Sequence, residues 1–215
     1  MAKEREIKLR IDDLPALRRS LAKLGAHVVT PRLHERNVVF DTPEFTLAKR
    51  EQLLRIRTES RAGRRRKSRS RSVVTFKRPM LAAGGERHKV REEIELEVSD
   101  AKALARIFEE LKMRGWFHYE KFRTTFRLPV SRVWAKGLLI ELDETPIGIF
   151  LELEGPASAI DRAAQALGFE KTDYVLANYM VLYREYCRSR GEEPRDMLFA
   201  KKKHGAGSAK SNNFS

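Results

Sequence analysis

Polar and apolar residues alternate along several short stretches of this chain. In the first stretch, Glu4, Glu6 and Lys8 alternate with Ile7 and Leu9. A period of two places the two sets on opposite faces of a β-strand. The same construction recurs at 53–57, 73–77, 91–98, 121–123, 140–143 and 151–154. The pattern predicts a sheet of about eight strands, each with one apolar and one polar face.

The polar faces carry charged residues of one sign at adjacent same-face positions. Arg55 and Arg57 share one face, and Glu152 and Glu154 share another. Further doublets are Lys121 with Arg123, Glu141 with Asp143, and Glu93 with Glu95. Like charges at this spacing repel unless a group of opposite sign lies between them. We infer that the charged faces surround one site, where acids hold cations and bases hold an anion.

Apolar residues at helical spacing predict four helices between or after the strands. The expected spans are 14–24 with a cap at Asp12-Asp13 and a stop at Gly25, 99–115, 155–168, and about 173–188. Residues 27–40 are interpreted as a loop followed by a strand. If the helices cover the apolar strand faces, the charged faces point the other way. The prediction is an α+β fold, a closed antiparallel eight-stranded β-barrel with a charged interior and helices outside.

Most of the net charge of +14 comes from two segments. Residues 61–72 contain seven arginines and lysines, residues 198–215 contain four lysines, and neither segment contains an acid. We predict one domain over residues 1–190, with 61–72 as a flexible basic loop and 198–215 as a disordered tail. A nucleic-acid-binding protein would more often spread its basic residues over a folded face, so nucleic acid is not the expected principal partner.

Two further features restrict the class of protein. The one cysteine, Cys187, excludes an intrachain disulfide framework. No basic and apolar leader precedes the first strand, and no apolar run is long enough to span a bilayer. We therefore expect a cytoplasmic protein with no membrane partner.

The ordered set of charged doublets resembles the CYTH superfamily, also called triphosphate tunnel metalloenzymes. Its signature Glu-x-Glu-x-Lys stands here as Glu4, Glu6 and Lys8. The matching segments that follow are Arg55-x-Arg57, Thr75-x-Lys77, Arg91-x-Glu93-x-Glu95, Lys121-x-Arg123, Glu141-x-Asp143 and Glu152-x-Glu154. A single signature of this kind is weak, but the ordered set is specific. The resemblance extends over residues 4–187, and the arginine-rich stretch at 61–72 departs from it.

The resemblance implies an enzyme that binds a triphosphate in the barrel with a divalent metal. The expected triphosphate-binding cations are Lys8, Arg55, Arg57, Lys77, Arg91, Lys121 and Arg123. Carboxylates do not bind phosphate directly, so they are expected to hold Mg²⁺ or Mn²⁺. The expected metal ligands are Glu4, Glu6, Glu152, Glu154 and Asp143, with Glu93 and Glu95 as supporting acids and with Lys8, Glu141 and Asp143 as catalytic residues. Zinc is not expected, because no His/Cys cluster is present.

Two reactions of this class are open. Water attacking the terminal phosphate would make the chain a triphosphatase, like thiamine triphosphatases and inorganic tripolyphosphatases. Attack by a ribose 3′-hydroxyl on the α-phosphate would make it a class IV adenylate cyclase. No distinctive purine-binding motif is present, so we favour hydrolysis of inorganic tripolyphosphate or of an organic or nucleoside triphosphate.

A non-catalytic module that binds polyphosphate or RNA is the alternative from another class of protein, and it would leave the paired acids unexplained. The expected partner is a small-molecule triphosphate. The sequence leaves open whether the protein forms a homodimer.

Overall fold

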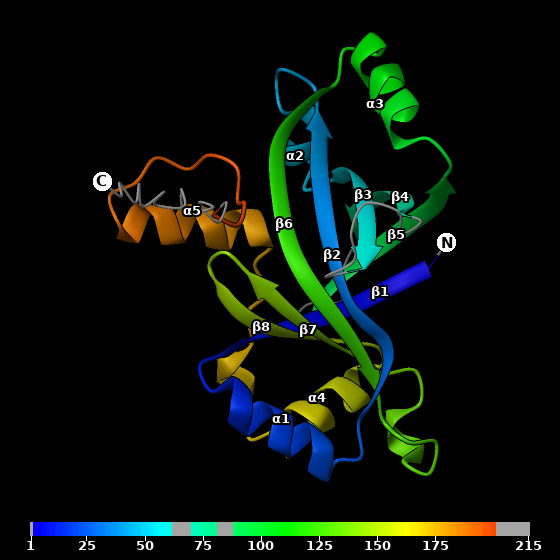
Figure 1. Cartoon of the computed structure of the whole chain (residues 1–215), viewed down its shortest axis with the longest axis vertical. Helices are drawn as coiled ribbons and strands as arrows, with labels where there is room; N and C mark the ends of the chain where they lie inside the picture. The colour runs from blue at the N-terminus through cyan, green and yellow to red at the C-terminus, as the bar shows by residue number, and fades with distance from the viewer. Residues whose placement is uncertain (1, 62–69, 81–87, 201–215) are drawn as a thin grey trace, which may run out of the picture.

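A computed structural model describes residues 2–61, 70–80 and 88–200. These residues form a closed barrel with the strand order β1-β5-β4-β3-β2-β6-β7-β8, in which all neighbours are antiparallel (Figure 1). The strands are β1 (Ala2–Ile11), β2 (His27–Asp41), β3 (Leu53–Arg61), β4 (Arg71–Pro79), β5 (Lys89–Val98), β6 (Arg114–Arg127), β7 (Leu139–Thr145) and β8 (Gly148–Glu154). The helices are α1 (Leu14–Lys23), α2 (Thr46–Lys49), α3 (Ala101–Glu110), α4 (Ala157–Ala166) and α5 (Tyr179–Ser189), with short 3₁₀ turns η1 (Val133–Ala135) and η2 (Lys171–Asp173). The predicted fold class is confirmed.

The register of β1 shows how alternation sets the two faces of the barrel. Leu9 lies opposite Leu151 of β8, and the next pair along is Lys8 and Glu152. Leu9 and Leu151 belong to the apolar layer outside the barrel, whereas Lys8 and Glu152 line its interior. A slip of one residue would exchange the two layers, so the hydrophobic pattern strongly specifies this register.

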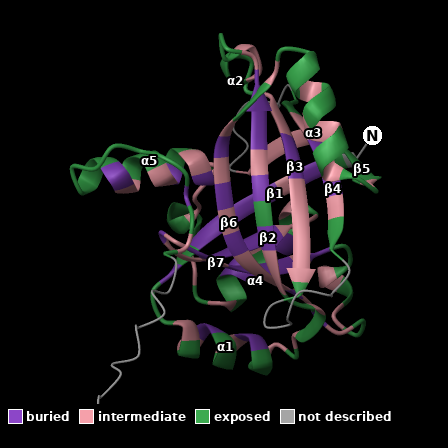
Figure 2. Cartoon of the chain, turned by 45° about the horizontal axis from the view of Figure 1, so that its top comes forward, coloured by how far each residue is buried: buried purple, intermediate pink, exposed green. Residues whose placement is uncertain are grey.

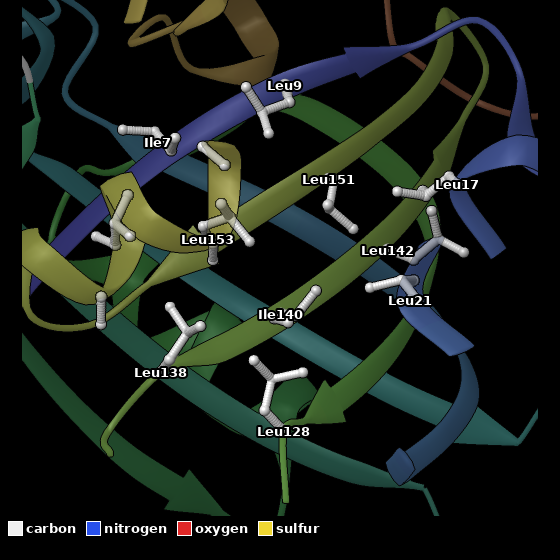
Figure 3. Packing of buried hydrophobic residues seen from close by; sticks show 14 of the residues in the cluster. Ile7, Leu9, Leu17, Leu21, Leu128, Leu138, Ile140, Leu142, Leu151 and Leu153 are labelled. Carbon is white, nitrogen blue, oxygen red and sulfur yellow. The ribbon is translucent and has the colours of Figure 1, made fainter. Parts of the chain in front are cut away.

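The main hydrophobic core lies outside the barrel wall. The outer faces of β1, β7 and β8 pack against α1 and α4, as Figure 3 shows for Leu17 and Leu21 of α1 beside Leu142 and Leu151. Leu151 is completely buried. In Figure 1, α1 and α4 lie side by side beneath these strands. Removal of these leucines from water stabilises the closed barrel without using its interior.

A second cluster lies where α5 meets the barrel. Tyr179 and Leu182 of α5 pack with Val39, Phe117 and other buried residues. The short helix α2 is held nearby by Asp41, whose carboxylate accepts hydrogen bonds from the backbone N–H groups of Leu47 and Ala48 at 2.9 and 2.8 Å. Burial of Asp41 is therefore compensated by helix capping.

Three predicted element boundaries are wrong. Residues 27–41 form one long strand, with register shifts around Thr30, next to Pro31, rather than a loop and a strand. The second predicted helix ends at Glu110, and Gly115 lies inside β6, because Lys112 makes the left-handed turn at φ 63°. The fourth predicted helix begins only at Tyr179. The chain before it is extended, since the backbone of Val175 pairs with that of Lys8.

Some residues at the ends of the two basic segments belong to strands or make ring contacts. Arg61 ends β3, and Arg71 and Ser72 belong to β4. The tail does not begin at residue 198, because the ring of Phe199 contacts those of Phe122 and His34. The remainder of these predictions, at 62–69 and 201–215, falls outside the described residues. None of the described helices combines the length and hydrophobicity needed to cross a bilayer.

Replacing Leu151 with alanine tests where the core lies. Its side chain is fully buried, so Leu151→Ala should lower the free energy of unfolding by about 2–5 kcal/mol. Val130 is 96% exposed, and Val130→Ala should change stability by less than about 0.5 kcal/mol. Chemical denaturation of the two variants measures both values. Equal stability of the two would show that the layer between β8 and the helices is not the main core.

Candidate functional site

The barrel encloses a cavity of about 770 Å³ that is lined by residues from all eight strands and the start of α5. The charged residues predicted from the sequence line this cavity, with the exception of Asp143. They are Glu4, Glu6, Lys8, Arg55, Arg57, Lys77, Arg91, Glu93, Glu95, Lys121, Arg123, Glu141, Glu152 and Glu154. Segments far apart in the sequence therefore contribute to one charged interior.

Asp143 lies behind the cavity wall rather than in it. Its side chain is fully buried, and Arg123 donates to both of its oxygens at 2.6 Å. Lys121 donates to the same carboxylate at 2.8 Å, and the hydroxyl of Tyr179 does so at 2.7 Å. Asp143 does not line the cavity, and its roles as metal ligand and catalytic residue stay predictions. Its contacts orient Lys121 and Arg123.

Arg123 is the most heavily paired cation of the interior. Besides Asp143, it makes ion pairs with Glu141 of β7 and Glu152 of β8. Burial alone would lower the pKa of Arg123, but these three carboxylates raise it well above the usual value. The guanidinium therefore joins three neighbouring strands by charge-assisted hydrogen bonds.

Lys8 forms a second centre of ion pairing on the same side. Its ammonium lies 3.0 Å from Glu6 and 3.3 Å from Glu152. Burial would raise the pKa of Glu6, but the charges of Lys8, Lys89 and Lys77 together outweigh burial and hold that pKa at about 2. Burial likewise would lower the pKa of Lys8, but Glu152 and Glu6 raise it. These groups stay charged although water hardly reaches them.

The arginines of β3 are less tightly paired than Lys77 of β4. Lys77 pairs with Glu4 at 2.5 Å and with Glu93 at 3.1 Å. Arg57 lies 2.9 Å from Glu59 but 3.4 Å from Glu95. Its neighbour Arg55 donates to the hydroxyl of Tyr119 at 3.0 Å and approaches Glu95 only to 3.9 Å. These guanidinium groups retain hydrogen-bonding capacity for an anion.

Of the predicted charged residues that line the cavity, Arg91 and Glu154 make no ion pair with any described residue. Glu154 lies opposite Glu6 in the sheet, and Glu141 lies opposite Glu152. Burial and the nearby Glu141 and Glu4 raise the pKa of Glu154 to about 8. Burial, with Glu152 and Asp143 adding repulsion, raises that of Glu141 to about 7. Negative charge is thus in excess where β1, β7 and β8 meet.

The carboxylates of β1, β7 and β8 are oxygen donors of the kind that bind a divalent metal. Carboxylates placed opposite one another favour a cation between them, and Mg²⁺ and Mn²⁺ prefer oxygen ligands. Over the described ranges, no three Asp, Glu, His or Cys side chains converge as a ready metal cage. Most of these carboxylates are ion-paired, so metal binding requires them to exchange lysine or arginine partners for the metal.

Several residues in or beside the cavity were missed by the sequence analysis. Lys89 pairs with Glu6 at 3.3 Å, and burial, with repulsion from Lys8 and Arg91, lowers its pKa to about 8. It stands one alternation step before Arg91, so the pattern of β5 could have included it. Glu35 is buried outside the cavity lining and lies 3.6 Å from Lys121; it was missed because residues 27–40 were not interpreted as one strand. No pattern in the sequence indicates that the hydroxyl of Tyr179 donates a hydrogen bond to Asp143.

Another part of the cavity wall is apolar. Val39 of β2 faces Phe117 of β6, and Leu53, Trp116 and Tyr119 line the same cavity. The indole N–H of Trp116 is buried and has no hydrogen-bond partner among the described residues. Since Tyr119 also accepts a hydrogen bond from Arg55, the apolar wall adjoins the cations. The cavity therefore offers both a charged and an aromatic surface.

Known proteins share this architecture. A solved structure of the PH1819 protein from Pyrococcus horikoshii superimposes with a TM-score of 0.67 at 21% identity, covering 85% of this chain and 98% of that one. A candidate adenylate cyclase from Vibrio parahaemolyticus gives a TM-score of 0.64 at 17% identity, with 86% and 97% covered. A Hippeastrum protein described as a candidate adenylyl cyclase with a dominant triphosphatase activity gives 0.54 at 21%, with 89% and 97% covered. These similarities establish the fold.

Sequence comparison agrees with the structural match. A candidate adenylate cyclase from Methanocaldococcus jannaschii is 27% identical over 165 residues, which cover 76% of this chain and 83% of that protein. The family model described as the CYTH domain matches residues 2–174, which include all eight strands of the barrel. By this match, the chain belongs to the CYTH domain family.

Proposed function

We propose that this protein is a divalent-metal-dependent triphosphatase that binds its substrate inside the barrel. The observation that carries the proposal is the cavity itself, in which seven predicted cations face carboxylates from neighbouring strands. The Hippeastrum protein of the same fold, with its described triphosphatase activity, supports hydrolysis over cyclisation.

The cations of the cavity divide into two groups by their pairing. Lys121 and Arg123 are held in place by Asp143, and Lys8 is held between Glu6 and Glu152. Their positions are fixed before substrate arrives, which lowers the entropic cost of binding. Arg55, Arg57 and Arg91 have hydrogen-bonding capacity left, and guanidinium groups match phosphate oxygens with two parallel donors.

The residues that would hold Mg²⁺ or Mn²⁺ are Glu4, Glu6, Glu152 and Glu154, with Glu141 beside them. A bound divalent metal supplies charge neutralisation for the triphosphate and makes bound water more acidic. Glu141 and Glu154 are the carboxylates whose own environment least stabilises their negative charge. They therefore gain most from a nearby cation. Asp143 is left out of the proposed ligand set because, unlike these glutamates, it does not line the cavity.

The apolar wall favours an organic triphosphate over inorganic tripolyphosphate. A cavity of about 770 Å³ is of the size that holds a drug-sized ligand, which exceeds what three phosphate groups need. An aromatic group attached to the triphosphate could pack on Val39, Leu53 and Phe117, and Trp116 offers an unused N–H donor. Contact with these side chains would position the phosphates among the arginines.

A substrate panel with product identification tests the proposal. Purified protein is supplied with Mg²⁺ or Mn²⁺ and with ATP, thiamine triphosphate or inorganic tripolyphosphate. Release of phosphate from the terminal position, abolished by chelator, is the expected result. Conversion of ATP to cyclic AMP and pyrophosphate would instead identify a cyclase. Tight binding of all three compounds with no turnover would indicate a non-catalytic polyanion-binding protein.

Replacing Glu154 with glutamine tests the metal site cleanly. Glu154 makes no ion pair with the described residues, so its neutralisation leaves no buried lysine or arginine unpaired. We expect the metal concentration for half-maximal activity to rise about tenfold or more, with little change in melting temperature. The control is Glu144→Gln, since Glu144 pairs with Arg32 away from the cavity. An unchanged metal requirement in Glu154→Gln would remove Glu154 from the ligand set.

Exchanging Arg57 for lysine tests how the phosphates are bound. Lysine keeps the charge but lacks the forked donors, so kcat/KM should fall about tenfold or more while the melting temperature stays close to that of the parent. Arg36 lies exposed on the same sheet, and Arg36→Lys is the matched control. Steady-state kinetics beside thermal melting provides both measurements. Parental kcat/KM in Arg57→Lys would argue against a forked contact with substrate.

A further inference from the structure

Lys89 lies beside the proposed metal ligands but has a single carboxylate partner. Its ammonium is 3.3 Å from Glu6, and no other carboxylate of the described residues lies within ion-pair distance of it. Lys8 and Lys77, in comparison, each pair with two carboxylates. A cation with one carboxylate partner loses that partner completely when the carboxylate binds a metal.

The register of three strands places Glu6 between Lys89 and Glu154. Glu6 of β1 lies opposite Glu154 of β8 on one side and opposite Lys89 of β5 on the other, and all three line the cavity. The Cβ atoms of directly opposed residues in antiparallel strands are about 5 Å apart. A divalent metal between the two glutamates therefore attracts the carboxylate of Glu6 toward β8, which is away from Lys89.

The strands β1 and β5 differ in how freely their side chains can move. β1 is buried along most of its length, whereas no residue of β5 is buried, as Figure 2 shows by purple for β1 and by pink and green for β5. The side chain of Lys89 is 15% exposed, and that of Lys8 is 4% exposed. Lysine has a flexible four-carbon stem, so Lys89 can leave Glu6 and contact another anion in the cavity.

Arg91 places a second cation next to Lys89. The two residues are two positions apart on one strand, so they lie on the same face of β5, and both line the cavity. Arg91 lies opposite Glu4, but that carboxylate pairs with Lys77. Once Glu6 has left Lys89, the strand presents two adjacent cations that need an anion, and a phosphate group meets that need.

We propose that Lys89 is a phosphate-binding residue that becomes available only when a metal binds Glu6. In the metal-free protein it neutralises Glu6 and competes with the metal for that carboxylate. In the metal-bound protein it binds a phosphate group of the substrate together with Arg91. This inference rests on the proposed function and gives a reason for cooperative binding, because the metal and the phosphate each remove the competitor of the other.

Replacing Lys89 with methionine tests the exchange by binding alone. Calorimetric titration measures the affinity for Mn²⁺, and the affinity for an ATP analogue with NH as its β,γ-bridge both in Mn²⁺ and in chelator. Without its competitor, Mn²⁺ should bind the free variant at least about threefold more tightly. In chelator the affinity for the analogue should stay within about twofold of the parent, since Glu6 holds Lys89 in that state. In Mn²⁺ it should fall about tenfold or more.

Further variants separate this exchange from a general loss of positive charge. Arg57→Gln removes a cation whose carboxylate partners lie outside the proposed ligand set, so it should weaken analogue binding equally with and without Mn²⁺. Lys89→Arg keeps the charge and should retain the dependence of analogue affinity on Mn²⁺ within about threefold. Thermal melting checks folding, and Lys8 still neutralises Glu6 in Lys89→Met. Lys89→Gln, whose amide can donate to Glu6, repeats the test if methionine disturbs the fold.

Two kinds of failure are distinguishable. If the parent binds the analogue only with Mn²⁺ but Lys89→Met keeps the same dependence on Mn²⁺, or loses affinity equally in both conditions, the role of Lys89 is overturned and the proposed function stands. If the parent binds the analogue in neither condition, the proposed function is overturned and this inference with it.

Discussion

Charge balance inside the barrel is the constraint on which the rest of this structure depends. Ionised groups shielded from water are tolerated only when opposite charges and hydrogen bonds surround them. Arg123 meets this demand by contacting Asp143, Glu141 and Glu152 on two neighbouring strands. Because the apolar faces of β1, β7 and β8 already pack against helices on the outside, the interior is free to hold a charged cavity rather than a hydrocarbon core.

The same balance explains why the interior suits a ligand. Ion pairs of this kind contribute little to stability compared with apolar packing, and removing one partner is costly. A triphosphate with a divalent metal brings both signs at once. The metal can take over carboxylates that the lysines and arginines release, and the phosphates can take over those cations. Arg91 and Glu154, which have no ion-pair partner among the described residues, are the groups from which such an exchange would begin.

Alternation along the strands made the barrel and most of the cavity predictable from the sequence. The period of two assigns each charged residue to a face, and Lys8 and Glu152 indeed meet across β1 and β8. Alternation carries no information on depth, so it could not distinguish Asp143 behind the wall from Glu141 in it. Tyr179 was unpredictable for a different reason, since it reaches the interior from a helix whose packing is set by tertiary contacts.

The central claim is that triphosphate and metal bind the cavity as one unit. Calorimetric titration with an ATP analogue whose β,γ-bridging oxygen is replaced by NH tests it without turnover, in Mg²⁺ and in chelator. Binding linkage predicts an affinity at least about tenfold higher with the metal, after correction for metal binding to the free analogue, and an equal gain in metal affinity when the analogue is bound. Equal affinity with and without metal would contradict the account.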